Sequence, residues 1–267
     1  MPELPEVETI RRAIEPAIAG ACITAISLPD PSIAGPEGPE ALLPAIGSTV
    51  REVFRRGKYL IQLLEQDRGL VIHMRMTGTL LLKKPVANVR LRAVLNYSNG
   101  RRIWFIDVRR LGTVRFYEDL QPLLQKLGPE PLGNDVSPES LKESLSKHRI
   151  PIKAALLDQH IIAGIGNMYA DEALYRAGIH PLTPACQLDY RHVANLLEAI
   201  RHVLEQAIAC QGASINTYRL PDGERGTAQD MFNVAHKKGY PCPRCGTPIE
   251  CVMIQKRGAY FCPACQS

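Results

Sequence analysis

Residues 59–73 read YLIQLLEQDRGLVIH, and this stretch decides how the first half of the chain folds. Two apolar runs, Tyr59–Leu64 and Leu70–His73, lie on either side of the turn-forming segment Asp67-Arg68-Gly69. Short apolar runs separated by turn residues are typical of neighbouring β-strands. The stretch therefore predicts two strands joined by a tight connection.

The same pattern continues from about residue 50 to residue 117. Further apolar runs occupy residues 80–82, 93–97, 103–106 and 114–117. Ser98-Asn99-Gly100 is a good hairpin turn, because Asn-Gly accepts positive φ at both central positions. Strands at this spacing predict an antiparallel sandwich or barrel.

The flanking sequence is helical in pattern. Val7, Ile10, Ile14 and Ile18 recur at helical spacing, and this helix ends near Gly20. Residues 118–138 are rich in proline and glycine and predict a linker between domains. Beyond the linker, helices are expected at residues 138–147, 151–158, 167–177 and 190–210. Residues 28–48 predict an irregular connection with a short helix at 39–45, and residues 211–230 predict a loop.

Charge is unevenly distributed, although the net charge is only +5. Residues 51–115 hold fifteen Lys and Arg against four acids, and residues 236–267 hold five against one. Two basic regions on an otherwise acidic chain favour a polyanionic partner, most simply nucleic acid. A solvated basic surface is the alternative interpretation.

Four of the eight cysteines form two CxxC pairs near the C-terminus. Sixteen residues separate the pair Cys242 and Cys245 from the pair Cys262 and Cys265. Two such pairs complete a closed tetrahedral four-cysteine site for Zn²⁺. Four protein ligands leave no open position, so the expected zinc is structural. Disulfides between the pairs are the disfavoured alternative.

The segment between the two CxxC pairs predicts a two-stranded ribbon. Its tip is expected at or near Lys256-Arg257-Gly258, and a basic tip on a metal-bound hairpin suits the groove of a nucleic acid. Cys251 lies between the two CxxC pairs, and we expect that it does not bind the zinc. The remaining cysteines, Cys22, Cys186 and Cys210, are expected to pack as small apolar residues.

The first nine residues, MPELPEVET, carry a different signal. Because the side chain of Pro2 is small, removal of Met1 is expected, which leaves a free secondary amine beside Glu3. A terminal amine titrates at about 7.7–8.0, so part of it is a nucleophile at neutral pH that can form a Schiff base. On these residues alone, a stiff arm built by Pro2 and Pro5 is the simpler interpretation.

Four further segments combine polar groups with glycines. Residues 56–59, 73–78 and 107–112 mix cations with apolar side chains and are expected on strands. Met76, Arg109 and Leu111 suit wedges in an unstacked duplex, although core packing also suits Met76 and Leu111. In residues 161–169, IIAGIGNMY, Asn167 is expected to cap a helix whose N–H groups bind phosphate. The same pattern is also typical of a plain turn.

Taken in order, these motifs resemble the formamidopyrimidine-DNA glycosylase family. The resemblance rests on MPELPEVET, RGKYL, HMRMTG, DVRRLGT, LLDQHIIAGIGNMYADEALY and the C-terminal zinc finger. It covers essentially the whole chain.

The resemblance implies a two-domain α+β fold. It comprises an N-terminal antiparallel β-sandwich with flanking helices (residues 1–130), a helical domain with a helix–two-turn–helix motif (131–230) and a four-cysteine zinc-ribbon hairpin (231–267). The implied activity is that of a bifunctional base-excision repair glycosylase and abasic-site lyase. It would remove 8-oxoguanine and formamidopyrimidines opposite cytosine through a Schiff base on the N-terminal proline, followed by β,δ-elimination.

The resemblance also assigns catalytic roles. Pro2 would be the nucleophile, Glu3 the proton donor and acceptor, and Lys58 an essential cation near the lesion. Glu6 would support the N-terminal site, and Arg257 is counted with the catalytic group. One structural Zn²⁺ would be the cofactor.

Damaged double-stranded DNA would be the partner of a monomer. The expected DNA contacts are His73, Met76, Arg109, Leu111, Lys153, Asn167 and Arg257. Met76, Arg109 and Leu111 would fill the gap left by the extruded nucleotide, with Arg109 facing the orphaned cytosine. Asn167 and Arg257 would bind the flanking phosphates, and Lys153 would lie near the phosphate or the damaged base.

Two positions depart from the family pattern. The family usually has Phe at the position of Leu111, and many members read Tyr-Gly-Arg where this chain has Ala235-His236-Lys237. Residues 213–230 correspond to the variable loop that covers the flipped base.

Two alternatives remain open. The endonuclease VIII branch removes oxidised pyrimidines with the same proline chemistry, but it usually carries Gly at the position of Leu4. A non-catalytic DNA-binding protein that uses only its zinc ribbon is the other alternative, and Pro2, Glu3 and Lys58 together argue against it.

The start of the chain has acids and prolines where a signal peptide would have a basic and then an apolar run. No membrane span is expected, because no apolar run reaches 18 residues. A bacterial cytoplasmic protein is the expectation.

Overall fold

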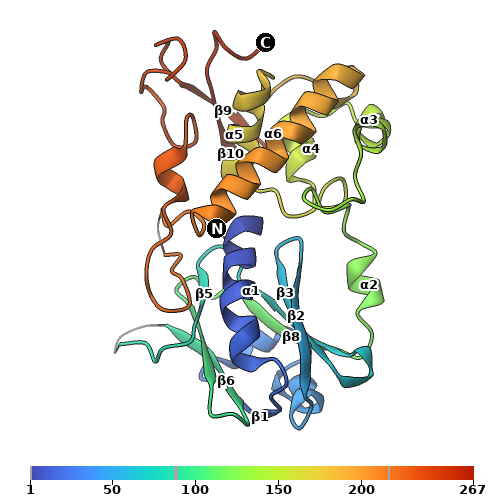
Figure 1. The fold of residues 1–267 in the computed structure, drawn as a ribbon, viewed down its shortest axis with the longest axis vertical. Coiled ribbons are helices and arrows are strands. Elements are labelled where there is room, and N and C mark those ends of the chain that lie inside the picture. Colours follow the sequence, from blue (N-terminus) through green and yellow to red (C-terminus); the bar gives the residue numbers. More distant parts are fainter. Residues whose placement is uncertain (1, 87–89, 216) are drawn as a thin grey trace. The chain divides into compact units, whose positions relative to one another are not determined.

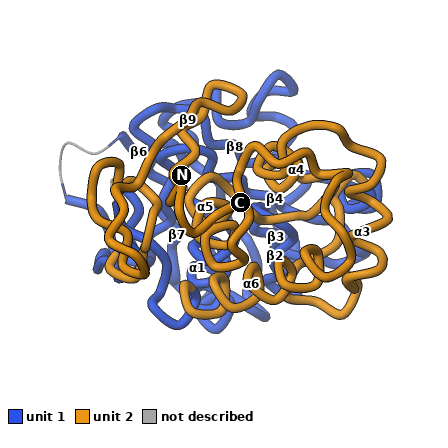
Figure 2. The backbone as a smooth tube through the Cα atoms, turned by 90° about the horizontal axis from the view of Figure 1, so that it is seen from above, with its two compact units in different colours: residues 1–125, 208–229 blue, residues 126–207, 230–267 orange. Residues whose placement is uncertain are grey.

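The computed structural model describes residues 2–86, 90–215 and 217–267. Two compact units make up the chain: unit 1 comprises residues 1–125 and 208–229, and unit 2 comprises residues 126–207 and 230–267 (Figure 2). Met1, whose removal the sequence predicts, lies outside the described residues. Asn216 of the predicted loop also lies outside them. The expected boundaries at residues 130 and 230 stay predictions.

Unit 1 contains two antiparallel sheets of four strands each. One has the order β1-β6-β7-β5, and the other has the order β2-β3-β4-β8. The first sheet consists of β1 (Ile23–Ser27), β5 (Gly78–Leu81), β6 (Leu91–Tyr97) and β7 (Arg102–Asp107). The second consists of β2 (Val50–Arg56), β3 (Tyr59–Leu64), β4 (Gly69–His73) and β8 (Thr113–Tyr117).

The two strands predicted from residues 59–73 pair as β3 and β4. Leu60 pairs with Ile72, and both belong to the core shared with the other sheet. Ile61 pairs with Val71, and both pack on the opposite face with Leu120 from the segment after β8. Burial on both faces explains why the run 59–64 is almost continuously apolar instead of alternating.

The N-terminal helix α1 spans Leu4–Ile18 and packs against β2 and β3 (Figure 1). Its buried stripe of Val7, Ile10, Ile14 and Ile18 confirms the helical spacing of the sequence. Packing of these side chains in the sandwich core fixes the start of the chain against unit 1. The short helices η1 (Pro31–Ala34), η2 (Pro39–Ala45), η3 (Glu65–Asp67) and α2 (Gln121–Leu124) complete residues 2–125.

Unit 2 is mainly helical. Its helices are α3 (Pro138–Ser146), α4 (Ile152–Leu157), α5 (Asn167–Ala177), η4 (Ala185–Gln187) and most of α6 (Tyr190–Ala209). Helix η5 (Ala228–Met231) follows at the return to unit 2. Between α4 and α5, the side chain of Gln159 accepts from Gly164 N and donates to Ile165 O, which ties two successive turns together. These features confirm the expected helical pattern.

The cysteine module contains the predicted two-stranded ribbon. β9 (Glu250–Ile254) pairs with β10 (Arg257–Phe261) in antiparallel register. Gln255 and Lys256 form the turn, and both have positive φ, as a two-residue hairpin with the twist of the strands requires. Arg257 is the first residue of β10, so the prediction of a basic tip is confirmed.

Two local expectations were wrong. The segments 56–59, 73–78 and 107–112 each run from a strand end into a turn, because their glycines and cations interrupt the apolar pattern. The N-cap of α5 is Gly166, and Asn167 is its first helical residue. The Asn167 amide bonds outside the helix instead, as described below.

Across the described residues, no helix has both the length and the hydropathy that a bilayer span demands.

Candidate functional site

The start of unit 1 is fixed by a reciprocal pair of hydrogen bonds. Glu3 N donates to Glu6 Oε2 at 2.7 Å, and the Glu3 side chain accepts from the backbone of Glu6 in a capping box. Pro2 is buried and Glu3 is only 1% exposed. The first residues of a domain are usually poorly ordered unless they are tied down. Here Glu6 ties them to the first turn of α1.

Glu6 also contacts a segment far along the chain. Its Oε1 accepts from Ala213 N at 2.8 Å, and the hydroxyl of Tyr218 donates to Gln211 O at 3.2 Å beside it. A Cβ on Gly212 would approach Glu6 Cγ to 2.9 Å, so the backbone there passes directly over the carboxylate. The segment predicted to cover the active site therefore contacts the residue predicted to support it.

Lys58 lies in the two-residue turn between β2 and β3. Gly57 precedes it with φ of +56°, and a hairpin turn with positive φ at its first central position favours glycine. Lys58 is nearly buried. The turn presents the lysine at the end of the sheet that α1 covers.

His73 ends β4 directly beside that turn. It pairs with Tyr59, and the two rings meet edge to face at 4.6 Å. Its Nδ1 accepts from Arg75 N at 3.0 Å. Burial lowers the pKa of His73 to about 3, and the cations Arg75 and Lys58 reinforce the shift. The ring is therefore neutral in the folded protein at physiological pH.

We expect the free energy of unfolding to fall with acid partly through His73. Between pH 6.5 and about 3 the unfolded chain binds a proton that the folded ring does not, so stability declines as pH falls through this window. The contribution is at most about 1.4 kcal/mol per pH unit. Urea titrations from neutral to acidic pH should give a shallower decline for His73→Gln. Equal slopes in the two proteins would contradict the assignment.

The three expected wedge residues lie on two loops of unit 1. Met76 precedes β5 and is 39% exposed, and Leu111 precedes β8 and is 45% exposed. Arg109 is exposed on the same loop as Leu111. The alternative that Met76 and Leu111 pack in the core is wrong, because both side chains face solvent.

In unit 2, two of the expected DNA contacts meet at the ribbon. Lys153 Nζ donates to Gly258 O at 2.7 Å, and Asn167 Nδ2 donates to the same carbonyl at 3.1 Å. The carbonyl belongs to the residue after Arg257. Asn167 and Lys153 thus meet next to Arg257, which is exposed at the end of the hairpin.

Sequence reasoning missed the acidic partner of Lys153. Asp171, one turn into α5, lies 2.7 Å from Lys153 Nζ, and both side chains are fully buried. Burial raises the pKa of Asp171, although the Lys153 ammonium opposes that shift. Its neighbour Glu172 accepts from the backbone N–H groups of Asn233, Val234 and Ala235. Asp171 thus pairs with Lys153 of α4, and Glu172 holds residues 233–235 against α5. The helical spacing of α5 gives no sign of either role.

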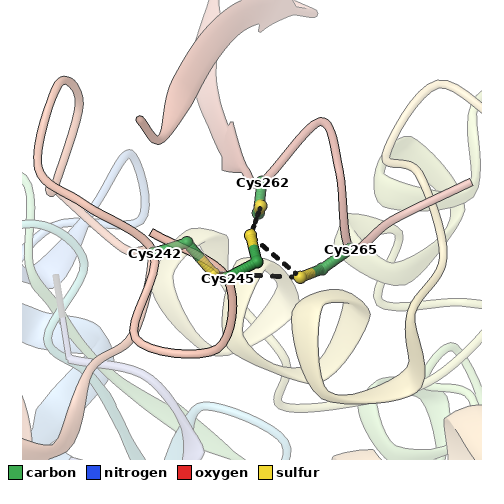
Figure 3. Close-up of side chains that lie close together, drawn as sticks. All are labelled: Cys242, Cys245, Cys262 and Cys265. Carbon is green, nitrogen blue, oxygen red and sulfur yellow. Dashed lines mark hydrogen bonds between the residues drawn. The ribbon is translucent and has the colours of Figure 1, made fainter. Parts of the chain in front are cut away.

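The four cysteines of the CxxC pairs turn their sulfur atoms toward one another (Figure 3). Cys245 Sγ lies 3.5 Å from Cys262 Sγ and 3.4 Å from Cys265 Sγ, and Cys242 Sγ lies 3.9 Å from Cys265 Sγ. Four sulfurs on a tetrahedral zinc with bonds of about 2.3 Å are separated by about 3.8 Å. The donor set and its spacing therefore fit one structural Zn²⁺.

The thiols of the cluster influence one another's pKa values. The hydrogen bond with Cys245 raises the pKa of Cys265 to about 12. Burial would also raise that of Cys242, but hydrogen bonds from the Tyr175 hydroxyl and from Arg244 N lower the pKa of Cys242 to about 6. Zn²⁺ binds thiolates, so binding of the ion would release the protons that the thiols hold in its absence.

We expect Tyr175 to strengthen zinc binding. Its hydroxyl lies 3.3 Å from Cys242 Sγ in a buried contact, and the Arg244 guanidinium covers its ring at 4.3 Å. Loss of such an outer contact typically weakens metal binding by roughly 10- to 100-fold. Tyr175→Phe should therefore release zinc to a chromogenic chelator at least about tenfold faster.

Tyr240→Phe is the matched control, because Tyr240 lies in the same module with its side chain exposed. It should release zinc at the wild-type rate. Equal release from wild type and Tyr175→Phe would show that the hydroxyl does not support the thiolate.

Three family models match the chain. Residues 1–114 match the formamidopyrimidine-DNA glycosylase N-terminal domain, and residues 127–219 match the formamidopyrimidine-DNA glycosylase H2TH domain. Residues 239–267 match the zinc finger found in FPG and IleRS.

Known proteins resemble the chain over its whole length. The formamidopyrimidine-DNA glycosylase of Chloroflexus aurantiacus is 44% identical, over all of this chain and 98% of its own. The MutM (Fpg) protein of Thermus thermophilus superposes with a TM-score of 0.90 at 39% identity, covering 99% of this chain and 98% of its own. A Lactococcus lactis Fpg mutant in complex with Fapy-dG containing DNA gives a TM-score of 0.90 at 36% identity over 100% of both chains.

The antiparallel sheets of unit 1, the helices of unit 2 and the four-cysteine cluster define a class, the zinc-finger DNA glycosylases of base-excision repair. Within that class, the chain belongs to the formamidopyrimidine-DNA glycosylase family. The resemblance stated from the motifs is thereby confirmed, as are the fold class and the zinc. Abasic-site lyase activity is general to this family.

Proposed function

We propose that this enzyme removes 8-oxoguanine and formamidopyrimidines from double-stranded DNA and then cleaves the abasic strand, with Pro2 as the nucleophile. The observation that carries the proposal is the fixed N-terminus. Pro2 and Glu3 are buried, and Glu6 binds the backbone of Glu3. The capping box and the bond from Ala213 account for the buried Glu6. A buried Glu3 carboxylate next to the amine of Pro2 is what the proposed chemistry requires.

The first chemical step is displacement of the damaged base. After removal of Met1, the secondary amine of Pro2 attacks C1′ of the nucleotide, and the C–N bond to the base breaks. The base leaves with the bonding electrons and takes up a proton, and the nitrogen of Pro2 gives up the proton of its N–H. Glu3 protonates the ring oxygen of the sugar, which opens the ring and gives a cationic iminium between Pro2 and C1′.

Strand cleavage follows from the charge on that iminium. It acidifies the proton on C2′, which a base such as the Glu3 carboxylate can now take. β-Elimination expels the 3′ phosphate, and δ-elimination expels the 5′ phosphate. Hydrolysis then returns Pro2 to the free amine. Lys58 is almost fully buried in the turn between β2 and β3. Its ammonium group is suited to stabilise the negative charge that develops on the leaving groups near the lesion.

The DNA contacts are proposed for each unit separately. In unit 1, Met76, Arg109 and Leu111 would fill the space of the extruded nucleotide, and His73 would join the contacts to the backbone. In unit 2, Asn167 and Arg257 would bind the phosphates that flank the lesion, as the bond from Asn167 to Gly258 O beside Arg257 supports. Lys153, which is buried and paired with Asp171, would lie near the phosphate or the damaged base and hold the same carbonyl. A leucine at position 111 offers less surface for stacking than the Phe usual in the family.

Oxidised purines are favoured over oxidised pyrimidines by the full-length likeness to enzymes named for formamidopyrimidine. The test compares excision of 8-oxoguanine opposite cytosine with excision of thymine glycol, in duplexes of the same surrounding sequence. We expect clearly faster release of 8-oxoguanine. A preference for thymine glycol would assign the chain to the endonuclease VIII type of activity and overturn the proposed substrate class.

A further inference from the structure

The two loops that carry the expected wedge residues meet at one buried carboxylate. Asp107 ends β7 and has no exposed surface. It accepts from Gly112 N at 2.6 Å and from Arg109 N at 3.2 Å, both in the loop before β8. It also accepts from the hydroxyl of Thr77, in the loop before β5.

Thr77 completes the connection in the opposite direction. While its hydroxyl donates to Asp107, its Oγ1 accepts from Arg109 N at 3.0 Å. One hydroxyl thus bonds both the carboxylate and the backbone of Arg109. Met76 and Arg109 are therefore held at a fixed separation, because Thr77 follows Met76 directly in the chain.

The buried charge of Asp107 has a buried counterion. Arg92 Nη1 lies 3.5 Å from Asp107 Oδ2, and Arg92 Nε lies 2.7 Å from Asp30 Oδ2. Asp30 in turn binds Arg110 Nε at 2.6 Å. Removal of one partner from a buried ionic network leaves an uncompensated charge, which is costly. The network therefore fixes the loop before β8 at two points, Asp107 and Arg110.

Backbone conformation shows that both loops are constrained. Arg75 and Arg110 have φ of +54° and +58°. Residues other than glycine rarely adopt this left-handed conformation. A Cβ on Gly112 would lie 2.5 Å from Phe105 Cζ, so the chain there passes directly over the core. Such conformations persist only where the surroundings impose them, and they occur often at functional sites.

We propose that Thr77 and Asp107 are positioning residues that join the two loops into one rigid wedge, so that Met76, Arg109 and Leu111 enter the duplex together. The inference rests on the proposed function, in which those three residues fill the space of the extruded nucleotide. Preorganised loops lose less conformational freedom when they enter the base stack. The connection therefore accelerates extrusion of the lesion and leaves the chemistry at Pro2 unchanged.

Thr77→Val tests this, because it removes the hydroxyl and keeps the shape of the side chain. Single-turnover rates would be measured on 8-oxoguanine paired with cytosine and on a preformed abasic site, which has no base to extrude. We expect excision to slow roughly tenfold or more, the size expected from misplaced groups, with abasic-site cleavage unchanged. A fluorescent 2-aminopurine next to the lesion should report slower unstacking in the same variant.

Two controls make the outcome specific. Thr77→Ser keeps the hydroxyl and should restore excision. Tyr97→Phe removes a comparable buried hydroxyl bond, 3.1 Å to Gln62 Oε1, in the core of the same unit, and should leave both rates unchanged.

Every result bears on the connection. Equal slowing on both substrates, or no slowing on either, would overturn the positioning role. Both rates are normalised to the fraction of protein that borohydride traps on abasic DNA, so that partial unfolding of Thr77→Val does not count as equal slowing. The ratio of the two normalised rates then decides. Wild-type protein that cleaves neither substrate would refute the proposed function itself, which is a separate failure.

Discussion

Pro2→Gly is expected to lose nearly all covalent trapping on abasic DNA while it still binds that DNA. Glycine offers a primary amine in place of the secondary amine, so an iminium that carries a positive charge at neutral pH no longer forms directly. It also removes the pyrrolidine ring from a buried position. Removal of a nucleophile commonly lowers turnover by several orders of magnitude, and we expect at least a ~100-fold loss here.

The measurement is borohydride reduction during reaction with an abasic duplex, followed by separation of the protein–DNA adduct. Pro5→Ala is the matched control, since it changes the second proline of the same segment. If the prolines only stiffened the arm, both variants would behave alike. An undiminished adduct in Pro2→Gly would point to a different amine, with Lys58 as the first candidate.

Cys245→Ser is expected to lose the zinc and with it the hairpin that presents Arg257. Structural zinc contributes folding free energy on the order of 10 kcal/mol in small modules, more than a hairpin of two five-residue strands supplies alone. Without the metal, the hairpin no longer holds Gly258 O in place, so the hydrogen bonds from Lys153 and Asn167 to this carbonyl are lost. A hydrogen bond to a charged group contributes about 1.5–3 kcal/mol, so the loss of the Arg257 contact should lower DNA affinity at least about tenfold.

Zinc content by atomic absorption and DNA affinity by fluorescence anisotropy would be measured on the same samples. Cys251→Ser is the control, because Cys251 lies on β9 in the same module and outside the four-cysteine cluster. It should keep one zinc per chain and full affinity. If a zinc-free Cys245→Ser protein bound DNA with wild-type affinity, DNA binding would not depend on the metal and the prediction would be wrong.

Local patterns predicted much of the fold. The spacing of Val7, Ile10, Ile14 and Ile18 predicted α1, because one face of a helix recurs every three to four residues. The CxxC spacing predicted the sulfur cluster, because two such pairs complete a tetrahedral zinc site. β1 is different: in Ile23–Ser27 only Ile23 is buried, so its apolar pattern is weak. Its pairing with β6 determines that it is a strand.

The candidate site was predictable in its residues and unpredictable in its contacts. Glu6 and Ala213 are hydrogen-bonded across 207 positions, and Thr77 meets Asp107 across 30. Lys153 and Asp171 form a buried ion pair between two helices. No periodicity relates such partners, since tertiary packing alone brings them together. The motifs therefore name the groups that do chemistry, while the groups that position them require the structure.

The central claim is that the amine of Pro2 forms the covalent bond to DNA. The most direct test is mass spectrometry of the borohydride-reduced adduct formed on an 8-oxoguanine duplex, after digestion of the protein and the DNA. The account predicts one modified peptide, the N-terminal peptide without Met1, with the sugar fragment on Pro2. A modified peptide that contains Lys58, or an unmodified N-terminal peptide that retains Met1 in a protein that still forms the adduct, would contradict it.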